Sequence, residues 1–201
     1  MSIPRVSVAD WANLPTDIEE TSLWRSVHDG NLQSIKSDLL ARTLTVRFEV
    51  PYLRSFHSLP DDLGFAFVLQ GVQSVRALRM TVWPGEFSLP SALNWEEHQE
   101  RMAEYRKLWR QESESWNTFE SAANSDEDAE LTDGDIVSAD GVVTLRLGVQ
   151  MTSGEWYEVF MRSETLTTTR TDQQEFALME LLSFGHLYWE AFAKRGAELQ
   201  R

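Results

Sequence analysis

The sequence predicts an α+β fold in which a curved antiparallel sheet of about seven or eight strands carries two long helices. Three observations lead to this class. Short stretches alternate apolar and polar residues, turn dipeptides separate these stretches, and two longer segments show helical spacing. Because strands joined by tight turns run antiparallel, the pattern does not indicate an α/β architecture. A chain of 201 residues is long enough for one domain, 1–201, with a sizeable core.

The clearest strand lies in the first half of the chain. Apolar and polar side chains alternate strictly from Thr43 to Val50, which is typical of a strand with one buried face. Residues 65–69 follow the same pattern, and Gly71 offers a turn into a further strand, 74–83.

Turn dipeptides predict three hairpins. Asp29-Gly30 separates the expected strands 23–27 and 32–35. Asp140-Gly141 and Ser153-Gly154 separate three further expected strands, which are 135–139, 142–151 and 155–162.

Residues 94–123 contain no Gly or Pro and predict one long amphipathic helix. An aromatic seam follows one face of it: Trp95, Met102, Tyr105, Trp109, Trp116 and Phe119. We expect most of the seam to cover the sheet. A helix of this length spans about 42 Å, whereas a typical strand spans about 17–20 Å, so part of the seam should overhang. Trp109, Trp116 and Phe119 are therefore candidate anchors for a protein partner.

The segment 121–135 carries six acidic and no basic residues and is expected to be a mobile acidic loop. With the preceding helix it would form an insertion, 94–135, in which Asp126, Glu127 and Asp128 are candidate partner contacts. An EF-hand beginning at Asp126 would need glycine at its sixth position and glutamate at its twelfth. Leu131 and Val137 stand there, so we expect no calcium loop.

The terminal segment predicts a second long helix that packs on the sheet. Thr171–Glu175 offers two capping boxes at its start, and apolar residues cover a wide arc from there toward Arg195. Gly185 lies inside this helix and costs roughly 1 kcal/mol of helix propensity relative to alanine. We therefore expect close backbone packing at this position.

Composition narrows the classes of function. The formal net charge of −14 disfavours nucleic acid as a partner. The absence of cysteine removes disulfides, thiolate nucleophiles and cysteine metal sites, and no phosphate-loop or serine-hydrolase motif occurs. We therefore expect no metal and no cofactor. The apolar stretch 176–193 is short for a bilayer span, and residues 1–10 show no secretory signal, so a soluble, cytoplasmic protein is expected.

Two histidines stand near carboxylates and keep an enzymatic hypothesis open. His28 precedes Asp29, and His186 lies one helical turn before Glu190. We favour structural roles for both. For His28 the reason is that neighbouring residues in a strand point to opposite faces, and that the Asp29-Gly30 turn already accounts for Asp29.

A small-molecule binding protein is a further alternative, with a ligand pocket between the sheet and the terminal helix. The candidate lining residues are His28, Phe65, Phe67, Trp156, His186 and Tyr188.

Two segments resemble known bacterial proteins. The opening Leu23–Gly30 resembles the Trp…His-Asp start of some small immunity proteins from toxin–immunity systems. Glu104–Ser113 resembles a helix in uncharacterised bacterial proteins with the same opening. The resemblance implies a non-catalytic protein that binds a protein partner. We therefore expect a bacterial protein-binding module, or a self-associating one, whose acidic surface steers a basic partner.

Overall fold

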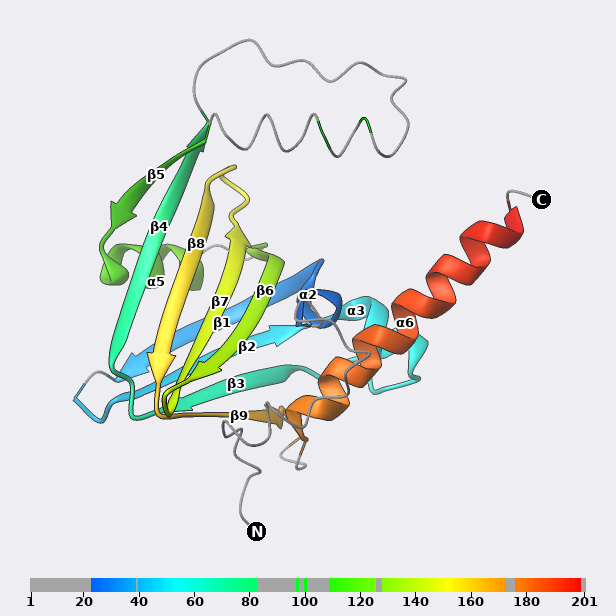
Figure 1. The fold of residues 1–201 in the computed structure, drawn as a ribbon, viewed down its shortest axis with the longest axis horizontal. Coiled ribbons are helices and arrows are strands. Elements are labelled where there is room, and N and C mark those ends of the chain that lie inside the picture. The colour runs from blue at the N-terminus through cyan, green and yellow to red at the C-terminus, as the bar shows by residue number, and fades with distance from the viewer. Residues whose placement is uncertain are drawn as a thin grey trace.

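The structure is a computed structural model that describes residues 23–38, 40–82, 97, 100, 109–125, 128–172 and 176–199. In these ranges the chain forms one sheet of nine strands in the order β5-β4-β8-β7-β6-β1-β2-β3-β9, and all neighbouring strands are antiparallel (Figure 1). The strands are β1 (Gly30–Asp38), β2 (Thr43–Glu49), β3 (Phe65–Gln70), β4 (Ser74–Val82), β5 (Trp109–Glu114), β6 (Glu130–Ala139), β7 (Val142–Gln150), β8 (Trp156–Ser163) and β9 (Thr165–Arg170). The helices are α2 (Trp24–Val27), α3 (Pro51–Phe56), α5 (Trp116–Ser125) and α6 (Leu178–Leu199). The predicted α+β class, with an antiparallel sheet and a C-terminal helix packed on it, is confirmed.

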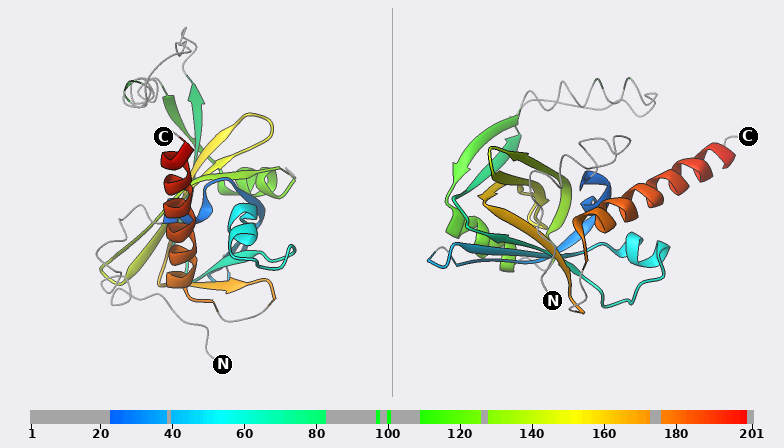
Figure 2. Two further views of the ribbon diagram at one scale, coloured as in Figure 1. Left: turned by 90° about the vertical axis from the view of Figure 1, so that its right-hand side faces the viewer. Right: turned by 60° about the horizontal axis from the view of Figure 1, so that its bottom comes forward.

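The sheet bends into two parts, β5-β4-β8-β7-β6 and β1-β2-β3-β9, whose strands run in different directions (Figure 1 and Figure 2). Strand β8 continues into β9 through the single residue Glu164, and β3 continues into β4 through 71–73. Both connections meet at one corner, because the Glu164 N–H donates to the Gln70 carbonyl (3.1 Å) and the Gln73 N–H donates to the Arg162 carbonyl (2.8 Å). The fold at this corner turns the apolar faces of the two parts toward a common core.

Alternation along the strands decides which side chains enter that core. Leu44, Val46 and Phe48 of β2 are at most 1% exposed. Phe65 and Phe67 of β3 lie on the same side and contact the Phe48 ring, with centroid separations of 5.9 and 4.8 Å. The strand predicted from Thr43 is thus confirmed, and Phe65 and Phe67 of the neighbouring strand β3 pack against its Phe48 ring in the core.

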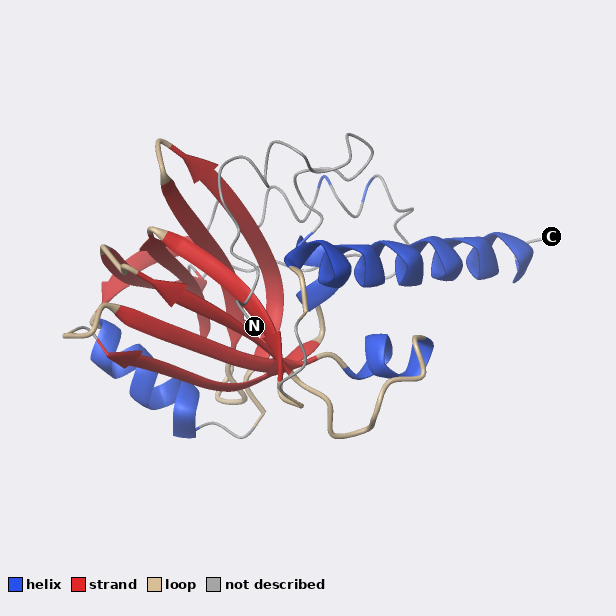
Figure 3. Ribbon diagram, turned by 90° about the horizontal axis from the view of Figure 1, so that it is seen from below, coloured by secondary structure: helices blue, strands red, loops and turns tan. Residues whose placement is uncertain are grey.

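Strands β1 and β6 separate after only two paired positions, and α5 covers the edge that β1 leaves open. Asn124 of α5 accepts a hydrogen bond from the Ile35 N–H (2.9 Å) and donates one to the Ile35 carbonyl (2.7 Å). Glu120 accepts a hydrogen bond from the Ser37 N–H (2.6 Å). Side chains of α5 therefore satisfy backbone groups that a further strand would otherwise pair. In Figure 3, α5 lies against one end of the sheet, whereas α3 and α6 lie at the other.

Strand β5 occupies the centre of the segment predicted as one long helix, so that prediction is wrong. Trp109–Glu114 pairs with β4 along the sheet edge, where Arg79 forms an ion pair with Glu112 (3.0 Å). Helix α5 begins directly after β5. The Ser115 hydroxyl caps its N-terminus by accepting a hydrogen bond from the Thr118 N–H (3.1 Å). Most of 94–108 lies outside the described residues.

Three further boundaries differ from the expected ones. Residues 24–27 form α2 rather than a strand, and Asp29 (φ 57°) links this helix to β1 instead of closing a hairpin. Helix α5 extends to residue 125 and β6 begins at residue 130, so most of the expected acidic loop is regular structure. Because β5 and β6 are strands of the sheet, 94–135 is not a simple insertion. Helix α6 begins at Leu178, later than the expected cap.

Candidate functional site

The first half of α6 is fixed to the body of the protein by α2. Leu181 and Leu182 are at most 1% exposed. The Ser26 hydroxyl of α2 donates a hydrogen bond to the Leu181 carbonyl (2.9 Å). Gly185 permits this approach, since a Cβ there would meet Ser26 Oγ and lie 2.6 Å from the Arg25 carbonyl oxygen. The close backbone packing expected at Gly185 is confirmed.

Aromatic rings strengthen the same junction. Trp24 of α2 stacks on Trp189 of α6 with a centroid separation of 5.1 Å. The Trp189 indole N–H and the Tyr52 hydroxyl both donate to the Arg25 carbonyl, each at 2.9 Å. Burial raises the pKa of the Tyr52 phenol well above its usual range, so the hydroxyl remains a donor at physiological pH. Hydrogen bonds and stacked rings therefore attach the first half of α6 to α2 and α3.

The second half of α6 projects beyond the sheet (Figure 2 and Figure 3). Its Phe192 is 58% exposed, and Leu187, on another side of the helix, is 46% exposed. Phe192 lies beside the ring of Tyr188 (6.2 Å), and Tyr188 meets Phe56 of α3 (5.6 Å), which is 37% exposed. We call Phe56, Tyr188 and Phe192 the α6 patch. It joins partly exposed rings from two helices, unlike the isolated apolar residues common on protein surfaces.

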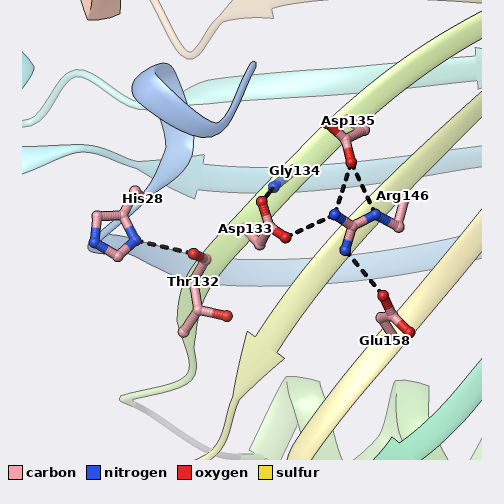
Figure 4. A network of polar contacts seen from close by, with 7 residues as sticks. All are labelled: His28, Thr132, Asp133, Gly134, Asp135, Arg146 and Glu158. Atoms are coloured by element: carbon pink, nitrogen blue, oxygen red, sulfur yellow. Dashed lines mark hydrogen bonds and ion pairs between the residues drawn. The ribbon is translucent and has the colours of Figure 1, made fainter. Parts of the chain in front are cut away.

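His28 links α2 to β6 and, among the histidines that the structure describes, lies closest to a carboxylate. Its Nδ1 lies 2.9 Å from the Thr132 carbonyl, which only accepts hydrogen bonds, so Nδ1 is the donor (Figure 4). Its Nε2 lies 3.2 Å from Asp29, since the left-handed turn at Asp29 brings both side chains to one side. Burial, and next the charge of Asp29, raise the pKa of the nearby Glu130 carboxyl. The Asp29 side chain is 58% exposed, so this group is not shielded from water.

His186 has a looser arrangement on α6. Its Nδ1 lies 3.2 Å from an Arg25 guanidinium nitrogen, and its Nε2 lies 3.6 Å from Glu190, as the spacing of four residues predicts. The Glu190 side chain is 49% exposed. Neither histidine–carboxylate pair occupies the water-poor cleft that the enzymatic hypothesis needs.

Arg146 organises a polar network on the outer face of β6, β7 and β8 (Figure 4). Its guanidinium bonds to Asp133 (2.6 Å), Asp135 (2.7 Å) and Glu158 (2.9 Å). Burial alone would lower the pKa of Arg146, but the hydrogen bonds with Asp135 and Asp133 outweigh it and the pKa is raised. Three carboxylates around one guanidinium leave this part of the surface acidic.

Within the described ranges, no group of three or more His, Cys, Asp or Glu side chains is arranged to hold a metal ion. Among the helices that the structure describes, none combines the length and the apolar character needed to cross a membrane.

Two of the three aromatic residues predicted to anchor a partner are buried. Trp116 is 8% exposed and Phe119 is 0% exposed, and both belong to the buried face of α5. Trp109 begins β5. Asp128 is exposed between α5 and β6, whereas Asp126 and Glu127 lie outside the described residues.

The predicted pocket residues separate into three places. Phe65 and Phe67 are buried in the core. His28, His186 and Tyr188 lie around the junction of α2 and α6. The sixth, Trp156, begins β8 and pairs with residues of β4 and β7 in the other part of the sheet.

Sequence reasoning missed the projection of α6, although its length carries the signal. Twenty-two residues make a helix of about 33 Å, longer than a typical strand of about 17–20 Å. An overhang was expected for residues 94–123, and α6 is a helix for which the structure shows one.

Comparison of the chain with family models, with curated proteins and with solved structures found no match.

Proposed function

We propose that this protein has a non-catalytic role and binds another protein through the projecting half of α6. The observation that carries the proposal is a change of burial along one side of this helix. Leu181 and Phe192 are about three helical turns apart, so they lie on the same side. Leu181 is 0% exposed against the body of the protein, whereas Phe192 is 58% exposed.

A partner is favoured because the aromatic rings of the α6 patch are exposed to water, which costs free energy that binding would recover. Burying an aromatic side chain such as Phe192 contributes about 1.5–3 kcal/mol. Because α2 and the aromatic junction already fix the helix, a partner that covers the α6 patch gains this energy with little ordering cost. A helix inserted into an apolar groove is a common mode of peptide and protein recognition.

The charge of the chain favours a basic partner. A formal net charge of −14 steers positively charged molecules toward the surface and repels acidic ones. Binding of a toxin by an immunity-like protein, which the opening Leu23–Gly30 resembles, would be one case of this function.

The first experiment identifies what contacts the patch. A photo-crosslinking phenylalanine analogue is placed at position 192 of the full chain in the cells that produce it, and crosslinked products are identified by mass spectrometry. The matched control places the same analogue at Val137, which is 56% exposed on the sheet. We expect a discrete protein adduct from position 192 that is absent from position 137. The same adducts from both positions, or none from 192, would contradict the proposal.

The second experiment tests the affinity with purified proteins. The identified partner is titrated with the wild-type chain, Phe192→Glu and Val137→Glu in a calorimeter. Loss of a central aromatic anchor should weaken binding by at least about tenfold, which corresponds to 1.4 kcal/mol. Equal affinities of Phe192→Glu and Val137→Glu would show that the contact at position 192 does not carry the binding.

A further inference from the structure

A depression of about 380 Å3 lies on the outer face of β4, β7 and β8. Leu78 of β4 contributes to its lining and is only 5% exposed, although it is on the outer side of the sheet. Phe160 of β8 is half-buried beside it. The depression thus combines an apolar residue shielded from water with an aromatic ring, and its volume falls within the range of about 300–1,000 Å3 typical of small-molecule sites.

Two arginines at this depression have no acidic partner among the described residues. Arg76 stands directly opposite Phe160 on β4, and Arg162 follows Phe160 on the same side of β8. Both side chains are exposed, and the structure gives neither a hydrogen bond nor an ion pair within the described part of the chain. Arg146, on the other side of Phe160, differs because three carboxylates surround it.

Hydroxyl groups stand next to the unpaired arginines. Ser74 and Thr144 are directly opposite Arg162 on the two neighbouring strands, and both line the depression. Glu158 lies on the other side of Phe160 along β8, where Arg146 binds it. One end of the depression therefore offers cationic and neutral donors, and the other end is acidic.

We propose that this depression binds a small anion in which a carboxylate or phosphate group is attached to a flat apolar ring. The planar guanidinium groups of Arg76 and Arg162 match the geometry of carboxylate and phosphate oxygens. The ring of the ligand lies against Phe160 and Leu78. The acidic end at Glu158 repels the anionic group and so fixes the orientation of the ligand with its charge toward Arg162.

Charge complementarity supports this ligand class. The net charge of the chain is −14, and Arg42, Arg54, Arg79 and Arg170 each form an ion pair. Arg76 and Arg162 have no such partner among the described residues and lie close together on neighbouring strands, so an anionic ligand would supply the missing charge to both.

In the test, the full chain is titrated with phenyl phosphate and with benzoate, and binding is measured by calorimetry and by NMR. Inorganic phosphate serves as the charge without a ring, and phenol as the ring without a charge. We expect at least one of the two ring-bearing anions to bind more tightly than either comparator. We also expect its affinity to fall as the salt concentration rises from about 0.05 M to about 0.5 M. The relative affinities of phenyl phosphate and benzoate show whether the site prefers a phosphate or a carboxylate group.

Matched variants locate the site. Arg162→Gln and Arg76→Gln should each weaken binding by about tenfold. Arg47→Gln is the control, because Arg47 of β2 is also exposed and has no partner in the described residues, and it removes the same charge. Phe160→Leu should reduce the preference for the ring-bearing anion over inorganic phosphate. Absence of binding, or equal weakening by Arg47→Gln and Arg162→Gln, would overturn the proposal.

This site is independent of the α6 patch. Phe192→Glu should leave the affinity for the ring-bearing anion unchanged, so failure of one proposal is distinguishable from failure of the other.

Discussion

Substitution of Gly185 by alanine tests how α6 is attached. The added methyl group would meet the Ser26 hydroxyl oxygen and lie 2.6 Å from the Arg25 carbonyl oxygen and 2.7 Å from the Arg25 carbonyl carbon. Two of these atoms belong to the backbone of α2, so a side-chain rotation alone does not relieve the overlap. Helix α2 has to move away from α6, which breaks the buried hydrogen bond from Ser26 to Leu181.

The expected magnitude follows from three contributions. Overpacking of this kind costs about 1–3 kcal/mol. Loss of the hydrogen bond from Ser26 to Leu181 costs about 0.5–1.5 kcal/mol more. Alanine restores about 1 kcal/mol of helix propensity relative to glycine. We therefore expect Gly185→Ala to lower the free energy of unfolding by about 0.5–3.5 kcal/mol.

The assay is urea denaturation followed by tryptophan fluorescence, in which the stacked Trp24 and Trp189 report on the junction. The matched control is Gly196→Ala in the same helix, where a Cβ would meet nothing within 4 Å. This control should leave stability unchanged or raise it by up to about 1 kcal/mol. If Gly185→Ala is as stable as the wild type, the close contact between α2 and α6 is refuted.

Three further substitutions test separate parts of the structure. Asn124→Ala leaves the N–H and carbonyl of Ile35 without their side-chain partner, so the urea midpoint should fall with a loss of about 1–3 kcal/mol, and a loss within error would argue against the role of α5. Arg146→Met leaves three neighbouring carboxylates without a cation, so it should destabilise the protein at neutral pH. The difference from wild type should shrink below about pH 4, where carboxyl groups protonate, and a pH-independent difference would contradict the network. Glu130→Gln should raise stability at neutral pH, because the raised pKa of Glu130 means that folding disfavours its charged form. The gain should disappear in acid, where the carboxyl is protonated in both states, and a gain that persists in acid would exclude this cause.

Strands with one buried face were predictable because alternation is a local signal. Residues 43–49, 142–150 and 156–163 alternate along the sequence and form β2, β7 and β8. The turn at Asp140-Gly141 was also predictable, since both residues adopt positive φ angles (53° and 75°). These elements need no information about distant parts of the chain.

Elements whose conformation depends on tertiary contacts were not predictable in the same way. Strand β5 is polar and lies at a sheet edge, so its pairing with β4 overrides a helical spacing of tryptophans. Strand β9 was missed because Leu166 is its only aliphatic residue, although its four threonines favour strand structure. Ser115 is of a residue type that favours the N-cap, so it could have indicated where α5 begins.

The candidate sites depend even more on the tertiary structure. The sequence suggested His28, whose ring contacts Trp189 of α6, and Tyr188, which belongs to α6. The length of the terminal helix indicates that part of it extends past the sheet, but not that Phe192 lies in that part. The identity of the projecting residues depends on where the contacts with α2 and α3 end along α6. The meeting of Arg76 with Arg162 depends on the pairing register of β4 with β8, which alternation alone does not determine.

Hydrogen exchange along α6, measured by mass spectrometry on the isolated chain, distinguishes a free projecting half from one that is already covered. We predict slow exchange of backbone amides at residues 182–189, which are held by α2 and the aromatic junction. Amides at 193–199 should exchange rapidly and gain protection only when the partner identified by crosslinking is added. Equally slow exchange along the whole helix of the isolated chain would refute an exposed binding surface on α6, because the projecting half would then already be covered.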